Sequence, residues 1–363
     1  MAYMKEVMNS GHLTGKGKFT DKCADFLSDK YGFRDVLLTT SCTAALEMAA
    51  LLIDIKAGDE VIIPSFTFVS TANAFALRGA KIVFADSGTE NPDMDVTQLE
   101  KLITPKTKAI VPVHYAGIAC DMDKIMELAA KYNLVVIEDA AHAIDSYYKG
   151  KPLGYIAHLS AFSFHETKNI TCGEGGMLVI NDQKFADRAE VLIEKGTSRK
   201  DFNSGKATKY EWVGLGSSYR LPELSAAFLF AQLQALETIQ ERRKTQWNTY
   251  YIGLTELEKN GIIRLPVIPE YAQHNSSIFY MLCKNENQRA HLIKSLALKG
   301  ISAAFHYQPL HLSPFYLSVT GERTTIENSE KFAECLVRLP LYSGLKEEEV
   351  SFIIDETNRI LRR

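Results

Sequence analysis

Between residues 36 and about 185, short apolar, β-branched runs alternate with longer stretches of helical spacing. Runs such as residues 61–64 and 134–138 have the composition of strands buried on both faces. The stretches between them, such as residues 43–54 and 121–132, have the length and apolar periodicity of helices. This alternation indicates βαβ units, and it therefore predicts an α/β fold with a mostly parallel central sheet.

The remaining segments complete the expected order of elements. Residues 36–40, 81–84 and 109–114 are expected strands, and residues 69–78 and 95–103 are expected helices. Residues 158–165 and 177–180 are separated by a Gly-rich gap too short for a helix, which favours a hairpin-like closing edge. A long helical pattern at residues 220–250 then connects to a smaller C-terminal α+β domain, with strands expected at 277–283 and 301–306 and helices at 287–299 and 327–337. We expect a large domain over residues 1–245, including the connecting helix, and a small one over residues 246–363.

Two charged residues follow expected strands in this scheme. Asp139 ends the run at 134–138, and Lys168 lies in the loop after the strand at 158–165, followed by a Gly173-Glu174-Gly175-Gly176 run. Ligand groups gather at the carboxyl ends of strands in α/β proteins, so both side chains can face one site. A lysine and a buried carboxylate in one site suit pyridoxal phosphate: the lysine forms the Schiff base and the carboxylate keeps the pyridine nitrogen protonated. Taken singly, such a lysine is commonly a surface residue and such an aspartate a helix cap.

Polar groups near this pair suggest a phosphate cradle. The segment from Thr40 through Cys42 and Thr43 joins a strand to a helix, whose first backbone N–H groups point at any anion placed there. Ser163, five residues before Lys168, offers a hydroxyl to the same phosphate. The structural alternatives are a plain Ser41 helix cap and a strand serine bonded to the backbone.

Two rings are candidates for contact with the cofactor. Phe68 lies at the carboxyl end of a strand and can stack on the pyridine ring, although a core phenylalanine is the commoner explanation for such a residue. His142, three residues after Asp139, can bond the cofactor's phenolic oxygen or lie against its ring, or it can be a satisfied structural histidine.

Composition limits the partners, the metal content and the cellular compartment that we expect for this chain. Net charge is −3, with 41 basic and 44 acidic residues well mixed, so neither nucleic acid nor an anionic membrane is an expected partner. Six cysteines without a C-x-x-C spacing favour reduced thiols over disulfides or a zinc site, so no metal is expected. No signal peptide begins at Met1 and no apolar run is long enough to span a bilayer, which predicts a cytoplasmic protein.

Several motifs together resemble a known family. Thr-Ser-Cys-Thr-Ala-Ala-Leu, Pro-Ser-Phe-Thr-Phe-Val-Ser-Thr-Ala-Asn-Ala, Glu-Asp-Ala-Ala-His-Ala and Ser-Phe-His-Glu-Thr-Lys-Asn are similar to motifs of the DegT/DnrJ/EryC1/StrS nucleotide-sugar aminotransferases. The similarity runs from residue 11 to residue 342. Within that family, Val113-His114-Tyr115-Ala116-Gly117, the His-Glu-Thr-Lys-Asn string and Gly216-Ser217-Ser218-Tyr219 are most similar to the branch that makes TDP-4-amino-4,6-dideoxygalactose.

The resemblance implies a fold type I aminotransferase that works as a homodimer with active sites built from both subunits. It assigns Lys168 as the cofactor lysine and Asp139 as the partner of the pyridine nitrogen. It also implies that Cys42, Thr43 and Ser163 hold the phosphate, that Phe68 stacks on the ring, and that His142 fills a position often held by Gln. In many relatives the position of Ser218 holds an Asn, and that Asn reaches the phosphate of the neighbouring subunit. This chain has Ser at that position, and the replacement puts that contact in doubt.

The implied reaction is a two-stage, ping-pong transamination. Glutamate gives its amino group to the cofactor, and the C4 ketone of TDP-4-keto-6-deoxyglucose then receives it, with Lys168 moving the proton in each stage. A pathway to O-antigen, common antigen or another glycan is expected. Lys16 and Arg220 are candidates for the diphosphate or the glutamate carboxylate, and His306 and Tyr307 for the sugar nucleotide.

Three alternatives stay open. One is an aminotransferase acting at C3, or one delivering the amine with the opposite C4 configuration. A second is a cofactor-dependent sugar dehydratase, although that branch of the family has His in place of the lysine. A third is a cofactor-binding sensor without turnover, against which the intact pair of Asp139 and Lys168 argues.

Overall fold

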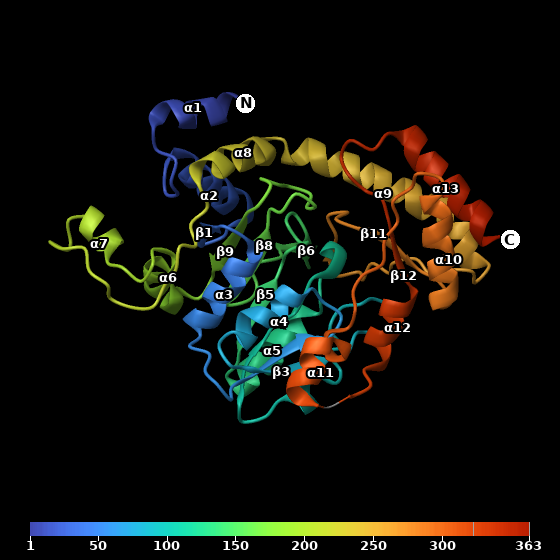
Figure 1. Cartoon of the computed structure of the whole chain (residues 1–363), viewed down its shortest axis with the longest axis horizontal. Coiled ribbons are helices and arrows are strands. Elements are labelled where there is room, and N and C mark those ends of the chain that lie inside the picture. Colours follow the sequence, from blue (N-terminus) through green and yellow to red (C-terminus); the bar gives the residue numbers. More distant parts are fainter. Residues whose placement is uncertain (322, 363) are drawn as a thin grey trace.

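The computed structural model describes residues 1–321 and 323–362 (Figure 1). Its centre is a seven-stranded sheet with the order β1-β9-β8-β5-β4-β2-β3. The strands are β1 (Asp35–Thr39), β2 (Glu60–Pro64), β3 (Lys81–Ala85), β4 (Thr107–Ile110), β5 (Val135–Asp139), β8 (Leu159–Ser163) and β9 (Gly176–Ile180). The neighbours from β8 to β3 are all parallel, so the predicted α/β class with a mostly parallel sheet is confirmed.

Helices cover both faces of this sheet. The side chain of Ile62 packs into the cluster that includes α2 (Lys18–Tyr31), α5 (Met122–Tyr132) and α8 (Glu223–Gln234). Its neighbours Val61 and Ile63 pack into the other cluster, which includes α3 (Cys42–Leu52), α4 (Val69–Ala76) and α6 (Ala186–Ile193). Successive strand residues point to opposite faces, so a strand covered on both sides must be apolar throughout. This three-layer arrangement explains the continuous apolar runs in the sequence.

One side of the sheet differs from its expected form. β8 and β9 do pair antiparallel, as the expected hairpin requires. The sheet does not close at β9, however, because β1 pairs antiparallel with it from Asp35↔Ile180 to Thr39↔Gly176. The edge strand is therefore β1, which comes from the beginning of the chain.

The C-terminal part has its own core. α9 (Leu236–Lys259) is a continuation of α8 after a break at Ala235, so the single helix expected at residues 220–250 is two helices. α9 packs with β11 (Phe279–Leu282), β12 (Leu336–Leu339), α10 (Glu286–Ala297) and α13 (Glu347–Leu361) around a separate apolar cluster drawn from residues 247–361. The expected domain boundary at 245/246 falls inside α9 and stays a prediction; Arg363, the last residue of the expected small domain, lies outside the described residues.

Two expected elements are wrong in kind. Residues 95–103 hold only the short 3-10 helix η1 (Leu99–Leu102). Residues 301–306 are irregular apart from one bridge, in which Ala304 pairs with Arg338 of β12. α12 (Glu327–Cys335) ends where β12 begins, so the helix expected at 327–337 is shorter by two residues.

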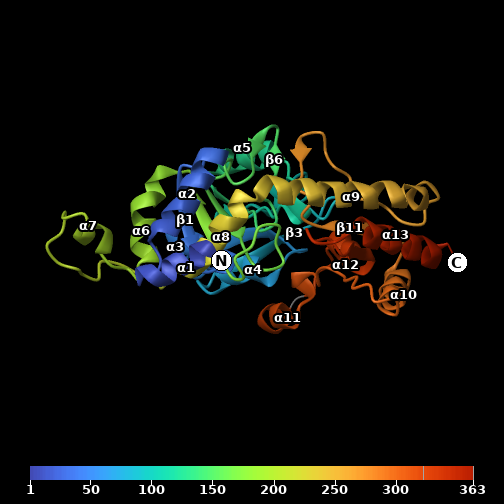
Figure 2. The same ribbon diagram turned by 90° about the horizontal axis from the view of Figure 1, so that it is seen from above.

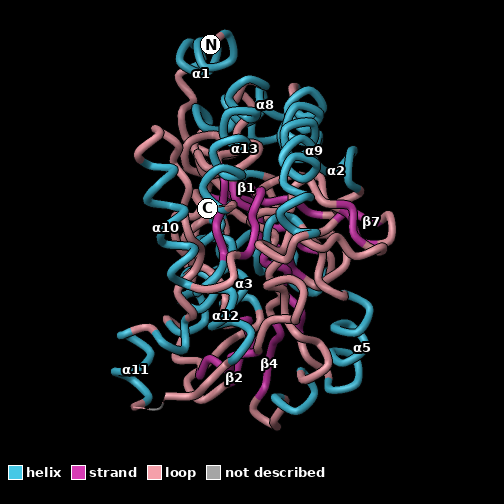
Figure 3. Tube along the Cα trace, turned by 90° about the vertical axis from the view of Figure 1, so that its right-hand side faces the viewer, coloured by secondary structure: helices cyan, strands magenta, loops and turns pink. Residues whose placement is uncertain are grey.

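Small elements and two N-terminal helices complete the chain. α1 (Ala2–Ser10) and α2 pack on α8, and Figure 3 shows α1 at one extremity of the molecule. α7 (Arg199–Asn203) belongs to a segment that stands away from the body in two perpendicular views (Figures 1 and 2). The others are η2 (Tyr115–Gly117), β6 (Tyr147–Tyr148), β7 (Lys151–Pro152), η3 (Gln183–Phe185), β10 (Ala272–Gln273), η4 (Leu310–Leu312) and α11 (Pro314–Thr320). Across the described parts of the chain, no helix combines the length and the apolarity needed to cross a membrane.

Candidate active site

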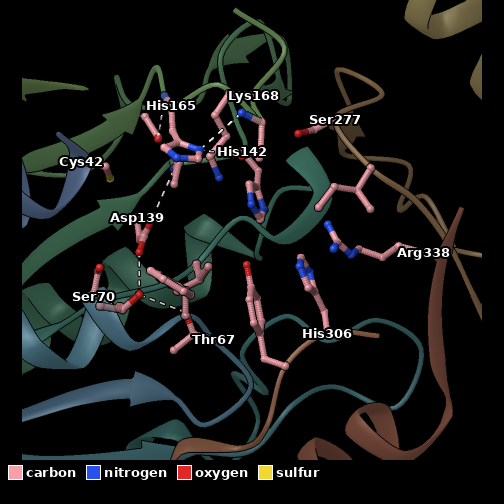
Figure 4. Close-up of a pocket in the computed structure, with 18 of the residues that line it drawn as sticks. Cys42, Thr67, Ser70, Asp139, His142, His165, Lys168, Ser277, His306 and Arg338 are labelled. Carbon is pink, nitrogen blue, oxygen red and sulfur yellow. Dashed lines mark hydrogen bonds between the residues drawn. The ribbon is translucent and has the colours of Figure 1, made fainter. Parts of the chain in front are cut away.

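A cavity of about 600 Å³ lies between the carboxyl ends of the central strands and the C-terminal part (Figure 4). One wall comes from the start of α3, the turn before α4, the end of β5 and the loop after β8. The opposite wall comes from residues 277–278, 302–307 and 338–341. Lys168 and Asp139, which the sequence places 29 residues apart, both line it.

Asp139 is the buried acid of this cavity. Its Oδ2 accepts a hydrogen bond of 2.7 Å from the Thr71 hydroxyl, and its Oδ1 accepts one of 3.2 Å from the Ala141 backbone N–H. The Thr71 hydroxyl is in turn 2.9 Å from that of Thr67. Burial raises the pKa of Asp139, while Thr71, Ala141 and Lys168 act to lower it. A cation bound beside Asp139 would oppose the effect of burial and favour the ionised form.

Lys168 lies in the loop after β8, with its backbone N–H bonded to the carbonyl of His165 at 2.9 Å. Burial lowers the pKa of its amine, and Arg338 lowers it as well, while Cys42 and Asp139 oppose the shift. Among the described residues the amine has no ion pair within 4 Å, so it faces the cavity free to react. A lysine of lowered pKa is suited to bond a carbonyl carbon and to move protons.

Hydrogen-bond donors gather near the start of α3. Ser41 caps this helix, its hydroxyl oxygen accepting from the Ala44 N–H at 3.0 Å, so the preceding N–H groups of Cys42 and Thr43 stay available. The Thr43 hydroxyl donates to Ser70 Oγ at 2.8 Å, and the His165 N–H donates to Ser163 Oγ at 3.3 Å. Both serine hydroxyls act as acceptors inside the chain and keep their own protons for a ligand. This set of donors suits a phosphate.

The two candidate rings border the same cavity. Phe68 is 56% exposed, which excludes the core role, and its ring lies 6.1 Å from that of Tyr307. His142 Nδ1 accepts a hydrogen bond of 3.3 Å from the Ala116 N–H, which leaves Nε2 as the protonated nitrogen. Burial lowers the pKa of His142 well below its usual value, so the ring is a neutral donor.

His306 and Tyr307 also reach the cavity. Their rings stack at 4.0 Å, and His306 Nδ1 is 3.1 Å from the Tyr115 hydroxyl. Burial lowers the pKa of His306 to about 3, with Arg338 and Lys168 adding to the shift. Both histidines are therefore uncharged at neutral pH, and the acidic and basic groups of the cavity wall include Asp139, Glu174, Lys168 and Arg338.

Arg338 is the main residue that sequence reasoning missed. It projects into the cavity from β12 (Figure 4), and within the described chain its guanidinium has neither a hydrogen bond nor an ion pair, with Nε fully buried. Thr71 and Ser70 were missed as well. They lie in the motif after Pro64. A helix that starts at the carboxyl end of a strand and has hydroxyl side chains in its first turn is a signal that could have identified them.

Three expected site residues lie outside the cavity of their own chain. The Arg220 guanidinium pairs with Glu190 and with Glu194, so it is not free to bind an anion here. Lys16 is exposed on the N-terminal loop, and Ser218 is exposed at the base of the segment that carries α7. Lys16, Arg220 and Ser218 are therefore absent from the lining of the cavity that holds Lys168 in the same chain, and their roles stay predictions.

The arrangement fits pyridoxal phosphate on three counts. The cavity holds a lysine of lowered pKa, a buried carboxylate with two donors fixing it, and a separate group of donors with free protons. A doubly wound sheet with this site at the carboxyl ends of its strands defines the class of pyridoxal-phosphate-dependent aminotransferases.

Comparison with known proteins agrees with that class. The profile of the DegT/DnrJ/EryC1/StrS aminotransferase family matches residues 1–358, and the chain belongs to this family. The spore coat polysaccharide biosynthesis protein SpsC of Bacillus subtilis is 34% identical over 366 residues, covering 98% of this chain and 93% of SpsC. The protein is a sugar aminotransferase with pyridoxal phosphate as its cofactor.

Solved structures share the whole fold. The putative sugar aminotransferase Spr1654 of Streptococcus pneumoniae, solved in its PMP form, superposes with a TM-score of 0.92 at 27% identity, covering 99% of this chain and 96% of that one. PseC of Helicobacter pylori, an aminotransferase of pseudoaminic acid biosynthesis, gives a TM-score of 0.91 at 27% identity, covering 99% and 95%.

Proposed function

We propose that this enzyme transfers the amino group of glutamate to the C4 ketone of TDP-4-keto-6-deoxyglucose and makes TDP-4-amino-4,6-dideoxygalactose. The proposal of a transamination rests mainly on one observation: Lys168 and Asp139 line the same cavity as a group of hydrogen-bond donors that suit a phosphate. The choice of sugar rests on the strings around Val113 and Lys168, which resemble one branch of the family and which both contribute to the cavity wall.

Each residue has a proposed part in holding the cofactor. Lys168 would hold it covalently between substrates, and Asp139 would bond its pyridine nitrogen. Cys42, Thr43 and Ser163 would hold the phosphate, helped by Ser70. Phe68 would stack on the ring, and the Nε2–H of His142 would face the cofactor as a donor.

The chemistry follows from these placements. When bound, pyridoxal phosphate supplies an electron-accepting ring that stabilises negative charge at the α-carbon of the amino acid. In the first stage Lys168 Nζ, whose pKa is lowered, would take the α-proton of glutamate and pass it to the C4′ carbon of the cofactor. In the second stage the same amine would take a proton from C4′ and deliver it to the C4 carbon of the sugar. Asp139 in its ionised form keeps the pyridine nitrogen cationic, because a negative charge beside that nitrogen favours the bound proton.

Arg338 is proposed to bind a carboxylate of the amino donor. A half-buried guanidinium without a partner is costly unless a ligand supplies the counter-charge. The planar group matches a carboxylate with two parallel hydrogen bonds. Its place on the wall opposite the start of α3 puts the donor's carboxylate and the cofactor's phosphate on different sides of the cavity. His306 and Tyr307 beside it would then contact the sugar nucleotide.

We further propose a homodimer in which the segment at residues 199–219 meets the partner subunit. This segment exposes Trp212 (78%), with Val213 and Leu215 also exposed. Apolar side chains gathered on a projecting segment are typical of an interaction surface. Ser218 at its base, with Lys16 and Arg220 nearby in the fold, would then serve the neighbouring site. Sedimentation of Leu215→Asp should show monomers that bind pyridoxal phosphate more weakly; an unchanged dimer would reject this interface.

The product decides the reaction. Wild-type enzyme with TDP-4-keto-6-deoxyglucose, glutamate and pyridoxal phosphate should give, by NMR, an amine that is axial at C4. An equatorial amine, or an amine at C3, would keep the aminotransferase and reject the proposed sugar. A product formed without glutamate would point to a dehydratase, and cofactor binding without any turnover would point to a sensor. Lys168→Ala is the control for a product that depends on this site.

We also propose that the large cofactor-binding domain ends near residue 245 and the small domain follows. The separate apolar cluster within residues 247–361 supports this division.

A further inference from the structure

Glu138, the residue before Asp139, is a fully buried carboxylate that the proposed reaction does not use. Adjacent strand residues point to opposite faces, so Asp139 faces the cavity while Glu138 points away from it. Five donors surround the Glu138 carboxylate within 3.2 Å: His114 Nε2 at 3.0 Å, the backbone N–H groups of Gly154 (2.7 Å), Ile156 (3.2 Å) and Ala157 (2.8 Å), and the Ser160 hydroxyl (3.2 Å).

This carboxylate is ionised. Burial acts to raise the pKa of Glu138, but His114 and the backbone donors overcome that effect and leave the pKa lowered. An ionised carboxylate only accepts hydrogen bonds and therefore matches five donors. A protonated Glu138 would place its own O–H donor against one of them.

His114 joins Glu138 to the backbone of Asp139. Its Nδ1 accepts from the Cys120 N–H at 3.2 Å, so the proton lies on Nε2, which donates to Glu138. The His114 backbone N–H donates to the carbonyl of Asp139 at 3.1 Å. One residue therefore holds both the carboxylate of residue 138 and the main chain of residue 139.

Glu138 also holds the strand that leads to Lys168. Residues 154–157 precede β8, and Ser160 lies opposite Glu138 in the register of β5 and β8. β8 ends at Ser163, five residues before Lys168. The same carboxylate thus bonds the segment that begins the strand carrying the lysine loop, and His114 links it to the end of the strand carrying the aspartate.

We propose that the buried pair of Glu138 and His114 is a positioning pair, which fixes the carboxylate of Asp139 relative to the amine of Lys168. This inference rests on the proposed function, because it takes those two groups as the partners of the cofactor. A displacement of about 1 Å between reacting groups can cost about 100-fold in rate, so a small shift of β5 against β8 is enough to matter.

Glu138→Gln tests the pair, because it keeps the side chain's size and removes its charge. We expect kcat for the glutamate half-reaction to fall by about 10–100-fold with the KM for glutamate nearly unchanged. The pH midpoint of the bound cofactor's visible absorbance should shift as well, since that midpoint depends on the charge held beside the ring. His114→Gln, which can still donate near the Nε2 position, should lose less than His114→Ala.

Glu60→Gln is the matched control. Glu60 is also a buried carboxylate in a strand of the same sheet, but it lies at the amino end of β2 and bonds Thr104. The Glu60→Gln substitution should lower the melting temperature without changing kcat or the pH midpoint of the cofactor's absorbance. The proposal is overturned if Glu138→Gln behaves like Glu60→Gln, with stability lost and both site readouts unchanged in the folded fraction.

The readouts separate this inference from the proposed function. If wild-type enzyme fails to take up pyridoxal phosphate or to convert glutamate, the proposed function fails. If wild-type enzyme does both and the variants keep the wild-type midpoint and rate, only the positioning pair is rejected. Should Glu138→Gln fail to fold, the comparison of His114→Gln with His114→Ala makes the same distinction.

Discussion

The hydroxyl of Thr71 offers a sharp test of how the cavity holds its cofactor. Thr71→Val keeps the shape of the side chain and removes the 2.7 Å hydrogen bond to Asp139 Oδ2. Thr71 is 1% exposed, so water cannot easily replace the lost donor. The Thr67 hydroxyl, 2.9 Å from that of Thr71, loses its partner at the same time.

The size of the effect follows from the charge of the acceptor. A hydrogen bond to a charged group contributes about 1.5–3 kcal/mol. The bond is worth most when Asp139 is ionised, which is the form that would hold the pyridine nitrogen. Its loss raises the pKa of Asp139 further in the direction that burial already drives it. We therefore expect the dissociation constant of pyridoxal phosphate to rise by about 10–100-fold.

The assay is a titration of cofactor-free enzyme with pyridoxal phosphate, followed by absorbance. Thr357→Val is the matched control, because Thr357 is also fully buried and its hydroxyl, among the described residues, bonds only the Ile353 carbonyl within α13, at 2.7 Å. The control should bind cofactor as the wild type does. Equal affinity for Thr71→Val and Thr357→Val would refute the role given to the Thr71 hydroxyl.

Three further outcomes follow from the same site. Lys168→Ala should lower turnover by about 10³-fold or more, because no other amine of the described chain lines the cavity; steady-state assays with glutamate check this, and near wild-type activity would reject the assignment. Arg338→Ala should raise the KM for glutamate by about 10–100-fold while the KM for the sugar nucleotide changes little, and Arg338→Lys should recover part of the loss; equal changes in both constants would contradict a donor-carboxylate site. The pKa of Lys168 lies below the usual 10.5 because of burial, so cofactor-free enzyme loses folding stability as pH falls from 10.5 to that lowered value, and the loss is complete below it. Lys168→Met should therefore melt higher than wild type at neutral pH, with the gap closing toward pH 10.5, and a gap independent of pH would refute the shift.

The chemistry-bearing part of the fold could be predicted from local sequence. The apolar runs before Asp139 and Lys168 mark strands covered on both faces, and the carboxyl ends of parallel strands share one edge. That reasoning brings Lys168, Asp139 and the start of α3 together, as the cavity does. The pair of Lys168 and Asp139 indicated the cofactor, and family resemblance then supplied the reaction class.

The remaining parts depend on contacts between distant segments. Arg338 lies about 170 residues after Lys168, and only the pairing of β11 with β12 turns its side chain toward the cavity. Arg220 had the right charge, but the nearby Glu190 and Glu194 occupy it. Residues 301–306 had the composition of a strand, yet only Ala304 finds a partner there. Propensity and spacing do not encode such long-range partners.

The edge strand β1 has a consequence for how the chain folds during synthesis. Its partner β9 is made about 140 residues later. Glu223 is made later still, and its carboxylate accepts hydrogen bonds from the N–H groups of Gly17 (3.0 Å) and Phe19 (2.8 Å) at the start of α2. At roughly 5–20 residues per second, the ribosome takes on the order of ten seconds to reach β9. During that time α2 lacks its packing partner α8, and β1 has no strand to pair with. A chain halted before residue 176 should therefore be the species most prone to aggregate and to need a chaperone.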